Sequence, residues 1–589
     1  MSRYPEHLTI GWLREQYAAG LTVSELAAEI VNRAQRDQEM NIWITPPELS
    51  RMQPYIERLA DIDPATAPLW GMPFAIKDNI DVAGYPTTSA CPDYAYVPGV
   101  NATVVERLIA AGAFPIGKTN LDQFATGLVG VRSPYGETRN AYHPELISGG
   151  SSSGSAVAVA KGQAVFALGT DTAGSGRVPA ALNGLFGYKP SHGAWSSKGL
   201  VSACASLDCI SVFTNTAEDA YAVDVVVRGY DSEDPWSRAI PRSLPTMPEK
   251  LLLPRQAPEF FGQYADSYRA AWEQAVQALE RSGIAIEYID TTMFDEAAAL
   301  VYEGPWIAER WAELGAFIEA NPGSLLPVTE AILRTGNERG RASDVYRVLH
   351  QVKRLRRKSR NLLQGRVLVM PTVGGTWTLE QLQEQPVEAN SELGRYTNHC
   401  NVLHLAGFAV PAGWAEPGLP FGLSFFALPE EEGVLFGAQA AFHHTSLPQV
   451  AAAERSRLPL QAPEYLDVAV CGLHMRGLPL ETQMRECGAR FIREAKTAPA
   501  YRLFKLHTVP AKPGLIRDER QGDAIVLELW RMPTVSFGAF VSRIPAPLGI
   551  GKVELEDGSW VSGFVCESYA SEAAEEITRY GGWRAAGNG

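Results

Sequence analysis

The chain has 589 residues, and 52 lysines and arginines against 66 aspartates and glutamates give it a formal net charge of −14. Apolar residues make up 46% of the sequence and charged residues 20%, which excludes a wholly disordered, collagen-like or disulfide-scaffold protein. The acidic balance provides no basic surface for nucleic acid and no attraction to an anionic membrane, so we expect neither partner.

Residues 1–20 contain early charges and lack the apolar core of a signal peptide. The most apolar stretch, residues 403–428, is interrupted by His404, Glu416 and three prolines, whereas a membrane-spanning helix needs about 20 nearly uninterrupted apolar residues. The seven cysteines are scattered without the spacing of zinc ligands, which predicts reduced thiols. We therefore expect a soluble, cytoplasmic protein.

Residues 22–38 have a helical pattern, with Leu26, Ile30 and Ala34 on one face and Ser24 near the start. Downstream of this helix, short apolar segments alternate with short amphipathic ones. The expected strands lie within residues 74–82, 114–120 and 164–169, and the expected helices within residues 104–111 and 155–161. This alternation predicts an α/β architecture with a central sheet.

Residues 235–364 contain long helical patterns, such as 266–282 and 343–363, which predict a helical insertion in the same domain. Strand-like segments return at residues 366–372 and 407–427. We therefore expect the helices of residues 235–364 to lie outside the central sheet and the later strands to belong to it.

Residues 446–463 are polar and contain prolines, which is typical of a linker. Short strand-like segments follow at residues 467–473, 501–506, 524–530 and 559–567. The sequence therefore predicts a large domain over residues 1–450, a linker over residues 451–465 and a small β-rich domain over residues 466–589.

The densest cluster of serine and glycine is GGSSSGSAVAVAKG at residues 149–162, followed by GTDTAGSGRVPAALNG at residues 169–184. A flexible linker would not be embedded between apolar elements, and a phosphate loop would need the lysine of GxxxxGK[ST], which is absent. Residues 150–154 match GxSxG, but a nucleophile elbow needs a strand directly before the serine, and the preceding segment contains a proline.

Another interpretation links Lys77, Ser151 and Ser175. Serine needs a base to act as a nucleophile, and a buried lysine can be that base because desolvation disfavours its charged form. Ser151 would then relay the proton from Ser175 to Lys77. Three backbone N–H groups in the stretch before Ser175 would form an oxyanion hole: those of Thr172, Ala173 and Gly174.

These residues resemble the amidase signature family, whose members use a Ser-cisSer-Lys triad. The matching motifs are PFAIKDN with Lys77, GGSSSGS with Ser151 as the cis-serine, and DTAGS with Ser175 as the nucleophile. Ala173 stands where the family often has glycine, but its N–H group remains. The resemblance covers nearly all of residues 20–450. It implies a central mixed β-sheet flanked by helices, with a helical insertion and without a metal or organic cofactor.

Within this family, residues 188–216 and the β-rich C-terminal domain most resemble allophanate hydrolases. The resemblance implies a small anionic amide substrate, urea-1-carboxylate, which is cleaved to ammonia and N-carboxycarbamate; the latter breaks down to further ammonia and carbon dioxide. Tyr302 and Arg310 in the helical insertion match the side chains that bind the substrate carboxylate, and Gly127 is a candidate for a backbone contact with substrate. The family also implies a homodimer.

Residues 466–589 resemble folds like that of γ-glutamylcyclotransferase, and His474 matches a histidine proposed to assist the breakdown of N-carboxycarbamate. Imidazole is suited to such acid–base chemistry near neutral pH. Two alternatives stay open. The C-terminal domain is equally consistent with an assembly module. The whole chain could be another amidase-signature amidohydrolase or a glutamine-hydrolysing amidotransferase component, although the latter does not predict this C-terminal domain.

Overall fold

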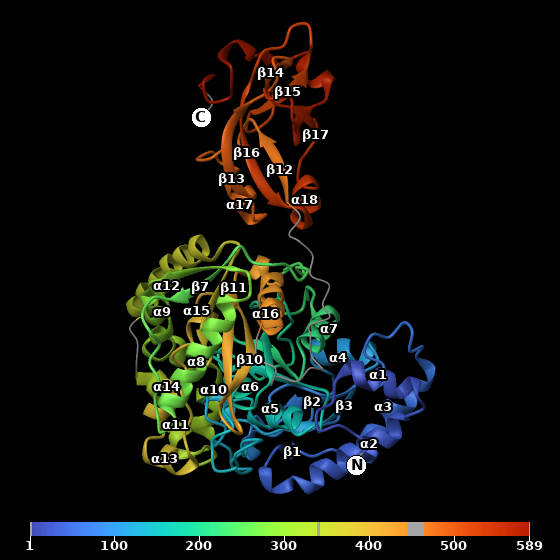
Figure 1. The fold of residues 1–589 in the computed structure, drawn as a ribbon, viewed down its shortest axis with the longest axis vertical. Coiled ribbons are helices and arrows are strands. Elements are labelled where there is room, and N and C mark those ends of the chain that lie inside the picture. Colours follow the sequence, from blue (N-terminus) through green and yellow to red (C-terminus); the bar gives the residue numbers. More distant parts are fainter. Residues whose placement is uncertain (1–2, 339–341, 446–464, 588–589) are drawn as a thin grey trace. The chain divides into compact units, whose positions relative to one another are not determined.

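The computed structural model describes residues 3–338, 342–445 and 465–587 (Figure 1). The chain divides into two compact units, Met1–Leu460 and Gln461–Gly589. The predicted linker, residues 451–465, lies outside the described residues except for Tyr465, which begins the first strand of the second unit.

In the described residues, the centre of the first unit is a mixed sheet of eleven strands. Their order is β1-β3-β2-β4-β6-β5-β10-β11-β9-β7-β8. β2 pairs in parallel with β3 and β4. Across the sheet from β4, the neighbours β6, β5, β10, β11 and β9 follow in this order, and each pairs with the one before it in antiparallel fashion. The strands are β1 (Trp43–Thr45), β2 (Pro73–Lys77), β3 (Phe114–Thr119), β4 (Phe166–Asp171), β5 (Phe186–Lys189), β6 (Cys209–Thr214), β7 (Lys250–Pro254), β8 (Ala285–Ile289), β9 (Arg366–Pro371), β10 (Ala406–Glu416) and β11 (Leu419–Ala427). The predicted α/β fold with a central mixed sheet is confirmed.

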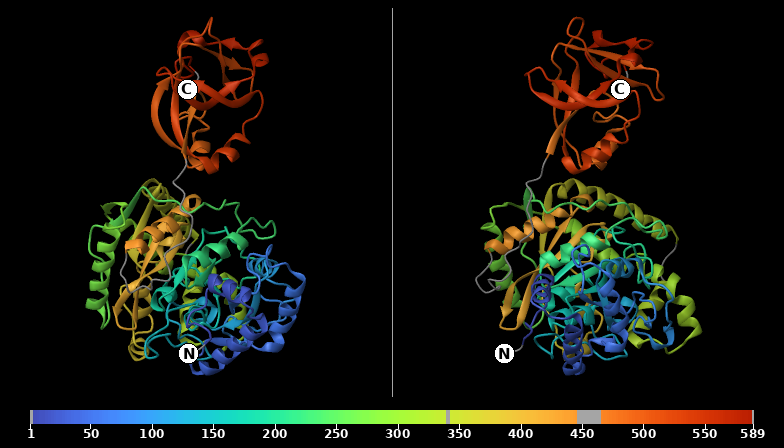
Figure 2. Two further views of the ribbon diagram at one scale, coloured as in Figure 1. Left: turned by 45° about the vertical axis from the view of Figure 1, so that its right-hand side comes forward. Right: turned by 90° about the vertical axis from the view of Figure 1, so that its right-hand side faces the viewer.

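Helices lie on both sides of this sheet (Figure 2). Alternate residues of β11 face opposite sides, as the pleat of a strand requires. Phe421 and Phe425 contact aromatic rings of α8 and α16, whereas Gly422 lies against α6 and Phe426 lies under Arg177. The helix α6 therefore packs on the face opposite to that covered by α8 and α16.

The five predicted helices are all present with small shifts of their ends, and Thr22, rather than Ser24, caps the helix α2 by pairing with Glu25. The helices of the first unit are α1 (Ile10–Ala18), α2 (Val23–Arg36), α3 (Leu49–Arg58), α4 (Thr103–Ala110), α5 (Ser153–Ala160), α6 (Val178–Leu182), α7 (Ala217–Val227), α8 (Ala265–Glu280), α9 (Thr292–Glu303), α10 (Trp306–Ala320), α11 (Pro327–Glu338), α12 (Ala342–Leu363), α13 (Leu379–Glu384), α14 (Glu388–Leu393), α15 (His399–Val402) and α16 (Gly433–Thr445).

The region predicted as a helical insertion contains α8 to α12, but it also contributes two strands to the sheet. β7 and β8 pair in parallel with each other, and β7 pairs in parallel with β9. A short apolar run such as that of β7 has no periodicity that separates a buried strand from a buried helix, which explains why the sequence did not predict it.

The second unit is rich in strands, as predicted. It combines a sheet ordered β13-β16-β12-β18-β17 with a smaller one ordered β15-β14-β19. Its elements are β12 (Tyr465–Val470), α17 (Glu481–Glu486), β13 (Arg490–Lys496), β14 (Tyr501–Leu506), β15 (Lys512–Arg517), β16 (Val526–Pro533), α18 (Thr534–Val541), β17 (Leu548–Glu554), β18 (Trp560–Cys566) and β19 (Glu575–Glu576). The unit has its own apolar core, which includes Trp530 and Leu527. Among the described helices, none has both the length and the apolar character needed to cross a membrane.

Candidate active site

Lys77 is the last residue of β2, and its amine lies between two hydroxyl groups. Lys77 Nζ donates to Ser151 Oγ at 2.7 Å and to Thr170 Oγ1 at 2.6 Å, and all three side chains are buried. β2 and β4 are parallel neighbours, so their carboxyl ends bring Lys77 and Thr170 to the same edge of the sheet. The predicted contact between Lys77 and Ser151 is present. Thr170 was not identified from the sequence. It lies in the quoted GTDTAGS run, but nothing in that run indicates that its hydroxyl faces Lys77.

Burial lowers the pKa of Lys77 to about 7, even though the nearby carboxylates of Asp122, Asp208 and Asp171 act in the opposite direction. The low-polarity surroundings penalise the charged ammonium, which must give up its hydration. Near neutral pH, a substantial fraction of Lys77 is therefore the free amine. Only this form can accept a proton.

Ser151 and Ser175 lie in two separate glycine-rich loops. The peptide bond between Gly150 and Ser151 is cis, as the sequence resemblance predicted. Ser175 lies between β4 and α6 and is 3% exposed. In the part of the chain that the structure describes, Ser175 Oγ makes no hydrogen bond, whereas Ser151 Oγ accepts one from Lys77.

The segment before Ser175 contains the three predicted oxyanion donors. The Gly174 N–H group donates to Asp171 Oδ1 at 2.8 Å, so it is not available to donate to an oxyanion. The N–H groups of Thr172 and Ala173 have no acceptor among the described residues. Gly174 has φ +139°, and a Cβ atom there would lie 2.3 Å from Thr397 Oγ1. Position 174 thus needs glycine because of its positive φ and the close approach of Thr397. Its N–H group is not a free donor for an oxyanion.

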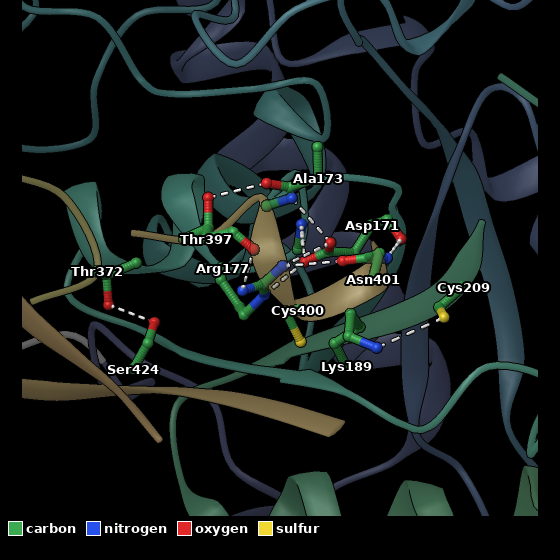
Figure 3. A network of polar contacts seen from close by, with 12 residues as sticks. Asp171, Ala173, Arg177, Lys189, Cys209, Thr372, Thr397, Cys400, Asn401 and Ser424 are labelled. Atoms are coloured by element: carbon green, nitrogen blue, oxygen red, sulfur yellow. Dashed lines mark hydrogen bonds and ion pairs between the residues drawn. The ribbon is translucent and has the colours of Figure 1, made fainter. Parts of the chain in front are cut away.

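A buried ion pair braces this segment (Figure 3). Arg177 Nε and Nη2 each donate to one carboxylate oxygen of Asp171 at 2.9 Å, and both side chains are fully buried. Arg177 Nη1 also donates to the Thr397 carbonyl at 3.1 Å. Burial would raise the pKa of Asp171, but Arg177, together with Lys189 and the Gly176 N–H group, lowers the pKa below its ordinary value. The sequence did not identify this pair, although both residues lie in the quoted motif.

Ser175 lines a cavity of about 310 Å³. Thr172 and Ala173, in the segment before Ser175, also line it, and so does Arg310 of α10 in the helical insertion. The cavity therefore places a serine hydroxyl, free N–H groups and a guanidinium around one small volume.

Of the predicted substrate-binding residues, Arg310 donates from Nη1 to Thr126 Oγ1 at 3.2 Å. Gly127 lines the same cavity with φ +157°, and a Cβ atom there would lie 2.7 Å from Asp122 Oδ2, which excludes any side chain. Tyr302 belongs to α9, but its side chain lies outside the described part of the structure.

We next compared the chain with known protein families. The family model described as Amidase matches residues 25–436, which are more than two thirds of the chain. The chain belongs to the amidase family. Family membership assigns it to the amidohydrolases, which cleave amide C–N bonds. The model described as the allophanate hydrolase C-terminal domain matches residues 466–588.

This amidase is similar over its whole length to a solved structure of Kluyveromyces lactis allophanate hydrolase, with 36% identity, a TM-score of 0.73 and coverage of 98% of both chains. It is 40% identical over 549 residues to urea amidolyase of Saccharomyces cerevisiae, covering 88% of this chain but 30% of the relative. It is 34% identical to a component of the glutamyl-tRNA(Gln) amidotransferase of Desulforudis audaxviator, covering 65% of this chain and 84% of the relative. The chain thus spans about a third of the length of the urea amidolyase.

The second unit of this amidase has a pocket of its own, with a volume of about 210 Å³ and His474, Lys512 and Arg543 among its lining residues. His474 stacks on Phe564 with ring centroids 4.8 Å apart, and its Nε2 lies 3.0 Å from Gln483 Oε1. Burial lowers the pKa of His474, so the imidazole is neutral near pH 7. Lys512 and Arg543 had not been identified from the sequence, since isolated surface cations carry no motif.

Proposed function

We propose that this chain hydrolyses allophanate, the urea-1-carboxylate anion, at its terminal amide. The observation that carries the proposal is the small cavity that Ser175 shares with the guanidinium of Arg310. A serine at one end supplies the nucleophile, and a planar, doubly donating cation at the other suits a carboxylate. The full-length similarity to the Kluyveromyces lactis allophanate hydrolase supports the same substrate.

In the proposed reaction, Ser175 Oγ attacks the terminal carbamoyl carbon of allophanate. Ser151 takes the Ser175 proton and passes its own to Lys77 Nζ, with which it is hydrogen-bonded at 2.7 Å. The N–H groups of Thr172 and Ala173 stabilise the oxyanion, because they have no other acceptor among the described residues. The proton returns through Ser151 to the departing nitrogen, and ammonia leaves an acyl-enzyme on Ser175.

Water then attacks the acyl-enzyme. The same relay from Ser151 to Lys77 removes the proton of the water molecule, and the Ser175 alcohol is regenerated as N-carboxycarbamate leaves. A neutral Lys77 at the start of each half-reaction is essential, which agrees with the lowering of its pKa by burial. In this proposal, Arg310, Tyr302 and the backbone of Gly127 hold the substrate.

We further propose that residues 1–450 and 466–589 are two domains and that the second acts on N-carboxycarbamate. Lys512 and Arg543 line the pocket of His474 and suit a ligand with two carboxylates. If Nε2–H of neutral His474 donates to Gln483 Oε1, the lone pair of Nδ1 can accept the proton of a carboxyl group and return it to nitrogen as carbon dioxide leaves. The assembly-module alternative predicts no effect of these side chains on product release.

We also propose a homodimer, which rests on the family resemblance alone, and a cytoplasmic location, which rests on the sequence features described above. Light scattering coupled to gel filtration of the full chain tests the oligomeric state. An apparent mass close to 64.0 kDa would identify a monomer instead.

The deciding experiment offers the purified chain allophanate, biuret, malonamate, urea and glutamine separately and measures ammonia. We expect allophanate to be turned over best and glutamine poorly. Ser175→Ala should reduce ammonia release by at least about 1,000-fold, because the nucleophile is lost. Near wild-type turnover in this variant would refute the assignment of Ser175, and a preference for glutamine would favour an amidotransferase component.

A further inference from the structure

The helix α10 packs against the rest of the unit through apolar side chains such as Trp306 and Leu314, and two successive polar side chains add hydrogen bonds to other segments. Arg310 Nη1 donates to Thr126 Oγ1 at 3.2 Å. The preceding residue, Glu309, is directed to a different segment, since adjacent residues on a helix point about 100° apart. The hydrogen bonds of these two side chains add directional constraints to the apolar packing of α10 beside the cavity.

Glu309 accepts three hydrogen bonds from one short loop, residues 203–208. Its Oε1 accepts from the Ser206 N–H group at 2.8 Å. Its Oε2 accepts from Ser206 Oγ at 2.6 Å and from Cys204 Sγ at 3.1 Å. Burial and the Glu309 carboxylate keep the pKa of the Cys204 thiol well above its usual value, so the thiol retains the proton that it donates. Hydrogen bonds to a carboxylate are among the stronger ones in proteins.

The same loop is bonded to the segment that contains the nucleophile. Thr172 Oγ1 donates to Asp208 Oδ1 at 2.5 Å, and Asp208 Oδ2 accepts from the N–H groups of Ala203 and Cys204 at 2.8 and 3.0 Å. Asn401 Nδ2, visible in Figure 3, donates to the carbonyls of Asp171 and Leu207 at 2.7 and 3.0 Å. Loop 203–208 is thus held against the residues just before Ser175.

These contacts form one continuous path: α10, Glu309, loop 203–208, Asp208 and Thr172. We propose that Glu309 is a positioning residue that sets the separation between the Arg310 guanidinium and the Ser175 hydroxyl, and thereby selects for a short anionic amide. The inference rests on the proposed function, in which Arg310 binds the substrate carboxylate. Glu309 itself is not among the residues that line the cavity.

The expected consequence is a loss confined to substrates that use both ends of the cavity. In Glu309→Ala, α10 loses its three side-chain hydrogen bonds to loop 203–208, so Arg310 is held less closely at the distance that suits the carboxylate. We expect the KM for allophanate to rise by about tenfold or more while kcat changes by less than about threefold. Biuret has the same length without the negative charge, so its KM, or its inhibition constant if it is not cleaved, should change by less than about twofold.

Two variants separate position from charge. Glu309→Gln keeps an acceptor for the Ser206 N–H group and can donate from its amide to Ser206 Oγ, so it should restore most of the affinity for allophanate. If Glu309 instead acted through its charge on Arg310, the glutamine variant would behave like Glu309→Ala and the proposal would be overturned. Glu313→Ala removes the same charge from an exposed position one turn further along α10 and should leave the kinetics unchanged.

Steady-state kinetics of the full chain with allophanate and biuret, together with the melting temperature of each variant, decide the question. If Glu309→Ala alters the KM for both compounds equally, or lowers kcat alone, the residue has a general structural role and the inference fails. If the wild-type chain does not hydrolyse allophanate at all, the proposed function fails instead, and this is seen before any variant is made.

Discussion

Lys77 Nζ lies 2.7 Å from Ser151 Oγ, with no part of the lysine side chain exposed to solvent. Two neutral groups in this geometry can exchange a proton directly, without help from water. A charged ammonium at the same position could only donate, and the relay from Ser175 would have no final acceptor. In the proposed mechanism, the protonation state of Lys77 therefore decides whether the Ser175 hydroxyl can be deprotonated.

The first prediction concerns the pH dependence of activity. Burial lowers the pKa of Lys77 to about 7. In the proposed mechanism, the active form is the neutral amine. The kcat/KM for ammonia release from allophanate should therefore rise with pH through about 7 and level off above it. Lys77→Arg keeps a positive charge at every accessible pH, and we expect a loss of at least about 1,000-fold throughout. A wild-type profile without change between pH 6 and 8 would contradict the assignment of Lys77 as the base.

The second prediction concerns stability and follows from the same lowered pKa. In the unfolded chain Lys77 returns to its ordinary pKa of 10.5, so between about pH 7 and 10.5 the unfolded state binds more protons at this residue. The contribution of Lys77 to the free energy of unfolding should therefore increase with pH in this window, by up to about 1.4 kcal/mol per pH unit.

Comparison with Lys77→Met isolates this contribution, because all other titrating groups are common to both proteins. Urea unfolding at pH 7, 8 and 9 should show the wild type gaining stability relative to Lys77→Met at each step. A difference in unfolding free energy that stays constant with pH would mean that Lys77 has an ordinary pKa in the folded chain.

The third prediction concerns the ion pair between Asp171 and Arg177. Removing one partner of a buried pair leaves an uncompensated charge and typically costs about 3–5 kcal/mol. Arg177→Met should therefore lower the melting temperature markedly and abolish activity, since the segment before Ser175 loses its brace. Arg177→Lys should not restore stability, because a lysine cannot form two parallel hydrogen bonds to the carboxylate.

A matched control is available at the surface. Arg366 Nη1 lies 3.8 Å from Glu287 in a partly exposed pair. Arg366→Met should change the free energy of unfolding by less than about 1 kcal/mol. Equal effects of the two substitutions would show that the buried pair contributes no more than an exposed one.

The sequence predicted those parts of the site in which a residue type and a fixed spacing are both required. Lys77, Ser151 and Ser175 belong to this class, and so does the alternation of helix and strand around them. Thr170 and Glu309 do not, because a threonine in a strand and a glutamate on a helix are common everywhere. Their importance comes from what the fold places next to them: the amine of Lys77 and the loop at residues 203–208.

The segment before Ser175 shows a second reason why a sequence does not predict a site completely. The sequence indicates three adjacent N–H groups, but it does not show which of them are already bonded. The Gly174 N–H group donates to the carboxylate of Asp171. This hydrogen bond depends on the turn that brings the two residues together, which the sequence does not show. The strand β7 was also missed, because its run of three leucines is too short to show a period.

The last prediction concerns the pocket of the second unit. If His474, Lys512 and Arg543 act on N-carboxycarbamate, His474→Ala should leave the first ammonia release unchanged and slow the formation of carbon dioxide. Lys512→Ala should have the same effect, because the cation that holds the carboxylates is lost. Gln483→Leu should weaken the effect of His474 by removing the acceptor that fixes its ring nitrogen, which lies 3.0 Å away. Stopped-flow measurement of ammonia and carbon dioxide in one reaction tests all three variants. A ratio of the two rates identical to wild type in every variant would mean that N-carboxycarbamate breaks down unaided and that this unit serves assembly instead.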